Sequence, residues 1–142
     1  MPARHTLALI SFLVAAALSV PATAGTKTVS GTGFELSASL PSVTKPGAPI
    51  ELTLALVPTT GRKINDEFPL SITVAAPADV KVPRTKLGRA DARVIGESRA
   101  VFPIALTPST AGERTITLDV RFAVCSDRAC EPQHQSIAVL VR

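Results

Sequence analysis

The sequence has no tryptophan and no tyrosine, and only five of its 142 residues are phenylalanine. Proteins that bind single-stranded nucleic acid stack bases on aromatic side chains, and such platforms are scarce here. Fifteen lysines and arginines stand against eleven acidic residues, yet the basic residues are scattered among acidic ones and form no run. The composition therefore predicts a solvated, mildly basic surface and no nucleic-acid partner.

Methionine and histidine are also rare, and each shortage excludes a kind of site. Met1 is the only methionine, so a copper site with a thioether ligand is excluded once the N-terminus is removed. His134 is the only histidine outside the first 24 residues, and the chain has no G-x-S-x-G motif. A serine hydrolase triad is therefore disfavoured.

One local group of side chains contains enough potential ligands to be weighed as a metal site: Cys125, Cys130 and His134, with Asp127 or Glu131 as a fourth. The spacing matches no common zinc pattern, and the chain has no second cysteine pair. Oxidation of the two thiols would also abolish the site. We therefore predict neither a metal nor any other cofactor.

The first 24 residues have the pattern of a secretory signal peptide. Arg4 supplies the positive charge, residues 7–20 are almost entirely apolar, and Ala22-Thr23-Ala24 is a small-residue cleavage site before Gly25. An uncleaved anchor helix is the alternative, but about 14 apolar residues are short for a membrane span. We expect a periplasmic or secreted protein with no stable membrane insertion after cleavage.

Residues 25–142 predict a single all-β domain. No segment keeps a helical period of 3.6 residues, whereas several short segments alternate apolar and polar residues with a period of two. Strands are expected at 34–40, 50–56, 70–74, 80–82, 93–95, 100–106, 114–124 and 136–141. Residues 26–33 are expected to be a flexible lead-in. The pattern predicts an immunoglobulin-like antiparallel β-sandwich of about seven to eight strands.

One proline interrupts this strand pattern. Pro103 lies within the predicted strand 100–106, where its missing N–H would remove a ladder hydrogen bond. We therefore expect that strand to be an edge strand or to contain a bulge.

The only two cysteines, Cys125 and Cys130, stand at the ends of a short polar loop between two extended segments. This arrangement predicts a β-hairpin and, in an oxidising compartment, a disulfide across its mouth. The bond would close a ring of six residues, for which chain entropy predicts a stabilisation of only about 2 kcal/mol. Cys125 has the parity of Thr117 and Arg121 and is expected to point away from the core. A small ring at an exposed tip favours exchange over stapling.

The hairpin resembles part of a known family. Phe122-Ala123-Val124-Cys125, a short polar loop, Cys130-Glu131-Pro132 and a closing strand resemble the periplasmic N-terminal domain of DsbD-type thiol:disulfide interchange proteins. Ala78-Asp79-Val80, Pro103-Ile104 and Ala111-Gly112 fall at corresponding places, and the likeness covers residues 61–141. The resemblance implies an immunoglobulin-like fold with a redox-active cysteine pair.

The resemblance also implies a role for each cysteine. Cys130 would form the mixed disulfide with a thioredoxin-like or other exported redox partner, and Cys125 would resolve it. Both would then be catalytic residues of a thiol:disulfide oxidoreductase component. Pro132 donates no ladder hydrogen bond, which predicts a chain that opens more easily around Cys130 than around Cys125.

The sequence also departs from that family. The family encloses five residues between its cysteines and this chain four. The family covers its pair with an aromatic cap loop, which we expect near Asp91–Gly96, where there is no aromatic residue. Asp66-Glu67-Phe68 resembles a cap but comes earlier in the order of strands. These differences leave a second hypothesis, a non-catalytic immunoglobulin-like structural or protein-binding module whose disulfide only staples the hairpin.

Overall fold

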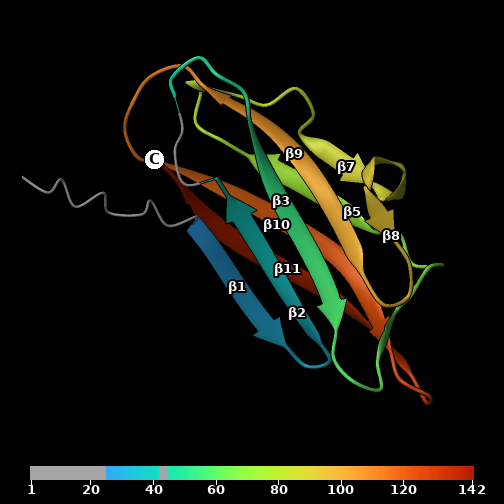
Figure 1. Ribbon diagram of the computed structural model, residues 1–142. Coiled ribbons are helices and arrows are strands. Elements are labelled where there is room, and N and C mark those ends of the chain that lie inside the picture. The colour runs from blue at the N-terminus through green and yellow to red at the C-terminus, as the bar shows by residue number, and fades with distance from the viewer. Residues whose placement is uncertain (1–24, 42–44) are drawn as a thin grey trace, which may run out of the picture.

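The computed structural model describes residues 25–41 and 45–142, which form two antiparallel sheets packed face to face (Figure 1). The first sheet has the order β1-β2-β3-β9-β6, with β8 also paired to β9: β1 (Gly25–Gly31), β2 (Phe34–Leu40), β3 (Ile50–Pro58), β9 (Ala100–Pro108), β6 (Val80–Lys81) and β8 (Val94–Ile95). The second has the order β11-β10-β5-β7, with β4 also paired to β10: β11 (Cys130–Val141), β10 (Arg114–Cys125), β5 (Ser71–Ala75), β7 (Lys86–Gly88) and β4 (Lys63–Ile64).

One 3₁₀ turn, η1 (Arg89–Asp91), follows β7. The signal peptide predicted over residues 1–24 lies outside the described residues. Within them, no helix is both long and apolar enough to cross a bilayer.

The core lies between the two sheets and is built from one alternating face of each strand. Phe34 of β2 and Phe122 of β10 meet across the layers, with ring centroids 4.9 Å apart and an interplanar angle of 82°. Both side chains are fully buried. The edge-to-face arrangement adds attraction between the rings to the effect of burial, so this pair links the two sheets near the hairpin.

The predicted two-layer antiparallel architecture is confirmed, and each of the eight predicted segments contains a strand. The described residues contain eleven strands, however, because three escaped prediction. The expectation of a flexible lead-in at 26–33 is wrong, since β1 pairs with β2 along its whole length from Gly25↔Leu40 to Gly31↔Phe34. β1 is almost wholly exposed and does not alternate apolar with polar residues, so its sequence shows no pattern that would predict a strand. β4 and β7, with two and three residues, are too short to show a period.

Pro103 occupies β9 without a bulge, because its register against β3 runs unbroken through Thr53↔Pro103. β9 is flanked on its other side by β8 at one end and β6 at the other. On that side, the carbonyl of Val101 accepts a hydrogen bond from the Arg93 amide. Pro103 is two residues further along the strand, so its backbone groups point to the same side as those of Val101. Its missing N–H therefore faces the gap between β8 and β6, where no ladder bond is lost.

The end of the sandwich opposite the cysteines is held by Asp79. Its carboxylate accepts hydrogen bonds from the Arg114 guanidinium and from the Thr110 hydroxyl, the latter at 3.2 Å. Its backbone carbonyl accepts from the Ser109 amide at 2.9 Å. The Arg114 hydrogen bond holds the pKa of the Asp79 carboxyl below its ordinary value of 3.8. This cluster ties the approach to β6 to the β9–β10 loop.

The lowered pKa predicts an acid-sensitive contribution to stability. A depressed carboxyl pKa stabilises the fold above the unfolded value, near 3.8, and this contribution is lost as the pH falls through the folded value. We expect Asp79→Asn to lower the urea midpoint at pH 7 and to converge with the parent protein near pH 2. Glu113→Gln, which removes the more exposed Arg142–Glu113 pair, is the control and should have a smaller effect. An equal loss at both pH values for Asp79→Asn would contradict the assignment.

Candidate functional site: a cross-strand disulfide

The two cysteines close the β10–β11 hairpin. The pairing runs without interruption from Arg114↔Val141 to Cys125↔Cys130, and the cysteine sulfurs form a disulfide with Cα atoms 4.0 Å apart. The predicted disulfide is thus present. β11 begins at Cys130, whereas the predicted strand begins at Ser136. The loop therefore consists only of the four residues between the cysteines.

Hydrogen bonds within the loop hold it in a compact turn. The Ser126 amide donates to the Ala129 carbonyl at 2.9 Å. The Ser126 hydroxyl oxygen accepts from the amides of Arg128 and Ala129, both at 3.3 Å. These bonds bring the two strand ends together within the oxidised hairpin.

The parity prediction for Cys125 is correct, but the expectation of an exposed position is wrong for this residue. Val124 lies in the core cluster, whereas Ala123 and Cys125 lie on the outer face and are excluded from that cluster. Cys125 is nevertheless only 4% exposed, while Cys130 is an exposed residue. The two sulfurs of one bond therefore belong to residues in very different environments.

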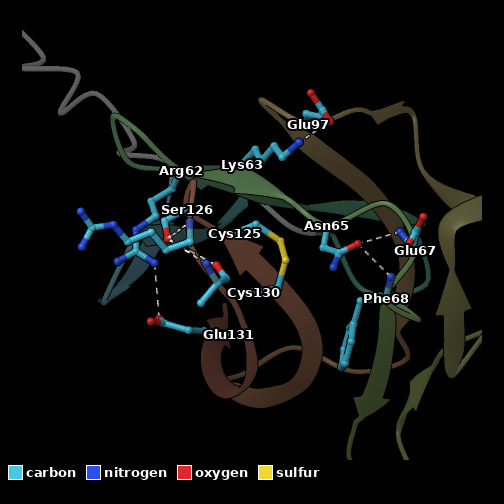
Figure 2. Close-up of a disulfide and its surroundings, with 12 residues drawn as sticks. Arg62, Lys63, Asn65, Glu67, Phe68, Glu97, Cys125, Ser126, Cys130 and Glu131 are labelled. Atoms are coloured by element: carbon cyan, nitrogen blue, oxygen red, sulfur yellow. Dashed lines mark hydrogen bonds and ion pairs between the residues drawn. A yellow bond between two sulfur atoms is a disulfide. The ribbon is translucent and has the colours of Figure 1, made fainter.

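The chain that follows β4 lies beside the outer face at this point. Lys63 pairs with Cys125 in the ladder, and the Asn65 amide donates to the Ala123 carbonyl at 2.9 Å. Because Ile64 faces the core, alternation places the Asn65 side chain on the outer face with Cys125. Figure 2 shows Asn65 and Phe68 on one side of the disulfide and the hairpin loop on the other.

The segment from Asn65 to Phe68, called here the 65–68 loop, has internal and external restraints. The Asn65 side-chain oxygen accepts hydrogen bonds from the amides of Glu67 and Phe68, at 2.8 and 3.2 Å. This is an Asx turn. Arg89 Nη2 donates to the carbonyls of Asn65 and Phe68 at the two ends of the loop, the second at 3.3 Å. The loop is thereby attached to η1.

The region in which we expected an aromatic cover lies in the other sheet. We predicted that cover near residues 91–96, but Val94 and Ile95 form β8 and pair with β9 in the other sheet. Phe68, whose sequence context resembles a cap, lies on the same side of the disulfide as Asn65 (Figure 2). The two-residue β4, which the sequence did not predict, pairs with β10 and places the start of this segment beside it.

An open cleft of about 410 Å³ adjoins Cys125, and its lining consists of Gly61, Arg62, Lys63, Cys125, Ser126 and Asp127. Both basic side chains of the lining have acidic partners. Arg62 Nη1 is 3.5 Å from Glu131 Oε2, and Lys63 Nζ is 3.2 Å from Glu97 Oε1. The two basic charges of the lining are therefore balanced by neighbouring carboxylates.

Gly33 positions Arg62 at this cleft. Its φ of 85° lies in the left-handed region, and a Cβ there would come within 3.2 Å of Arg62 Cγ. Glycine therefore serves both the β1–β2 turn and the packing of Arg62 over it.

His134, weighed above as a metal ligand, lies further along β11 and pairs with Arg121. Its Nε2 atom is 3.7 Å from the Asp119 carboxylate. Residues 25–41 and 45–142 contain no group of three or more potential ligands placed to hold a metal ion. The disulfide also occupies the two sulfurs that such a site would need.

Pro132 does not weaken the ladder around Cys130, contrary to the expectation from sequence. The hydrogen bond from the Ser126 amide to the Ala129 carbonyl makes Ser126 and Ala129 a hydrogen-bonded pair. Hydrogen-bonded and non-hydrogen-bonded pairs alternate along the ladder, so Ala123↔Pro132 is a non-hydrogen-bonded pair. The Asn65–Ala123 bond agrees, since it shows the Ala123 carbonyl pointing away from β11. The missing N–H of Pro132 thus faces the free edge of β11, where it discourages pairing with another strand.

The sequence matches no protein-family model, and it matches no characterised protein. Solved structures do share its fold. The GAE domain of GGA2p from Saccharomyces cerevisiae aligns with a TM-score of 0.50 and 8% identity, over 80% of this chain and 96% of that one. The GAE domain of yeast GGA1 aligns with a TM-score of 0.49, the same identity and the same coverage.

At such low identity the likeness concerns the fold alone. Together with the two antiparallel sheets, it shows that this chain is an immunoglobulin-like β-sandwich, as predicted. A cross-strand disulfide closes one end of this sandwich.

The unequal exposure of the cysteines predicts unequal reactivity after reduction. We expect Cys130 to be alkylated by iodoacetamide about tenfold faster than Cys125, which corresponds to a difference of about 1.4 kcal/mol in the free energy of access. Peptide mapping at successive times measures both rates. In 8 M urea, which removes the shelter, the two rates should become similar. Equal rates in the folded protein would contradict this assignment.

Proposed function

We propose that this chain is an exported thiol:disulfide interchange module that exchanges electrons with thioredoxin-like partners through Cys125 and Cys130. In this proposal residues 1–24 direct export to the periplasm or outside the cell, where an oxidising environment maintains the disulfide. The single observation that carries the proposal is the asymmetric bond, with one exposed cysteine and one that is 4% exposed.

The proposed exchange is a pair of thiolate displacements. A thiolate of a reduced dithiol partner attacks Cys130 Sγ, a mixed disulfide forms, and Cys125 leaves as a thiolate that takes up a proton. The partner's second thiolate then attacks its own sulfur in the mixed disulfide and releases Cys130. The partner loses two electrons and becomes a disulfide, while this chain gains two electrons and two protons. The reverse sequence oxidises the module.

Two further features support this direction of attack. Cys130 is the exposed sulfur-bearing residue, and its only ladder partner strand is β10, because β11 is an edge of its sheet. Phe68 of the 65–68 loop lies on one side of the disulfide (Figure 2), and the DsbD-type domains that the hairpin resembles carry an aromatic cover over their cysteine pair. The absence of tyrosine and the four-residue spacing distinguish this chain from those domains.

The proposal predicts a moderate reduction potential. Structural disulfides in exported proteins lie below about −300 mV, whereas exchange-active pairs lie above this value. We expect the Cys125–Cys130 couple, equilibrated with glutathione buffers and quantified by thiol labelling, to lie above about −300 mV. A lower value would favour the alternative, in which the disulfide only staples a non-catalytic module.

The proposal also predicts which single variant traps a partner. Cys125→Ser retains the exposed Cys130 and should accumulate a mixed disulfide with a thioredoxin-like protein that lacks its resolving cysteine. Cys130→Ser retains the buried Cys125 and should trap about tenfold less, in line with the alkylation rates expected above. Non-reducing electrophoresis measures both. Trapping mainly through Cys130→Ser would reverse the assigned roles, and trapping by neither variant would count against exchange.

A further inference from the structure

Arg89 is linked to the disulfide through the 65–68 loop and has no direct part in the chemistry proposed above. One of its guanidinium nitrogens, Nη2, carries two N–H groups and donates to the backbone carbonyls of Asn65 and Phe68. The side chain is half-buried, and no ion pair involves it within the described part of the chain. Its hydrogen bonds therefore hold the two ends of the loop rather than balance a carboxylate.

The base from which Arg89 acts is itself fixed. β7 pairs with β5 at Ser71↔Gly88, immediately before η1. The Gly88 amide donates to the Asp91 carboxylate at 2.8 Å, and Arg84 forms an ion pair with the same carboxylate. Arg89 thus connects the 65–68 loop to a restrained turn, so loss of its hydrogen bonds would free the loop while leaving the turn in place.

The leaving group of the proposed exchange explains why this connection matters. When Cys130 is attacked, Cys125 must depart as a thiolate, and burial disfavours a charged sulfur. Cys125 is 4% exposed, and Asn65, the first residue of the 65–68 loop, is hydrogen-bonded to the nearby Ala123 and lies on one side of the disulfide (Figure 2). Opening of that loop would admit water to the departing sulfur. The rate of exchange should therefore depend on how often the loop opens.

We propose that Arg89 is a positioning residue that holds the 65–68 loop closed beside Cys125 and so sets the rate of thiol–disulfide exchange without setting its equilibrium. The proposal rests on the exchange function proposed above. Arg89 donates to backbone carbonyls and not to sulfur, so its hydrogen bonds can persist in both redox states. A restraint that stabilises the closed loop equally in both states slows reduction and oxidation by the same factor.

The test uses dithiothreitol, a small dithiol that needs no docking surface. The oxidised chain is mixed with reduced dithiothreitol, and the reduced chain with the oxidised reagent, and thiol content is followed over time. Arg89→Ala should accelerate both reactions about tenfold, the factor expected for loss of a charge-assisted hydrogen bond. The ratio of the two rates should equal that of the parent chain. Arg89→Lys keeps a positive donor and should give intermediate rates.

Two matched variants separate this role from a general loosening of the fold. Arg93→Ala removes an exposed arginine that pairs with Glu51 on the other sheet, and it should leave both rates unchanged. Asn65→Ala removes the side-chain oxygen that accepts from the Glu67 and Phe68 amides and so loosens the same loop from within, and combining it with Arg89→Ala should give less than the product of the single effects. Urea midpoints of all variants verify folding, and Arg89→Lys decides the question if Arg89→Ala fails to fold.

The proposal is overturned if Arg89→Ala has the parent rates, if it changes reduction alone and shifts the ratio, or if Arg93→Ala has the same effect. Because dithiothreitol is not a partner, the result is independent of partner exchange. If neither cysteine variant traps a partner but Arg89→Ala still accelerates the dithiothreitol reactions, the proposed function is refuted and the role of Arg89 in the loop stands. If partners are trapped but Arg89→Ala has the parent rates, the role of Arg89 is refuted and the proposed function stands.

Discussion

The unbroken ladder between β10 and β11 determines where every group near the disulfide lies. Because the register continues without a bulge to Cys125↔Cys130, the even-numbered residues of β10 face the core and the odd-numbered ones face outward. A single inserted residue would exchange the two sets and bring Cys125 between the sheets. The same alternation directs the missing N–H of Pro132 to the free edge. One hairpin register therefore fixes the side of the sheet on which the disulfide lies.

Local sequence patterns were sufficient to predict that hairpin and most of the sandwich. Segments such as 34–40 and 114–124 alternate clearly enough to give both the strand and its buried face, and the cysteine spacing gave the disulfide. The same parity argument assigned Cys125 to the outer face correctly. These features are local: each depends on residues adjacent in sequence, which is where periodicity carries information.

The remaining features depend on contacts between distant segments, and no local pattern encodes them. Cys125 is 4% exposed, and β4 and Asn65, some 60 residues earlier in the chain, pair with or hydrogen-bond to β10 beside it. A strand of two residues shows no period, so this contact with β10 was not predicted. Pro103 and Pro132 were judged by their missing donors alone. The cost of a missing donor depends on which neighbour it would have faced, and that is a property of the assembled sheet.

The outer-face position of the disulfide has a consequence for the rest of the molecule. Phe122 and Val124 bury their side chains on the opposite side of the same strand, and the Phe34–Phe122 contact joins the sheets there. Opening the small Cys125–Cys130 ring removes only about 2 kcal/mol of chain-entropy stabilisation and no core contact. A disulfide placed between the sheets would have coupled bond cleavage to core packing. Here the ladder and core can persist in both redox states, so any change on reduction is confined to the hairpin tip and the loop that Arg89 holds beside it.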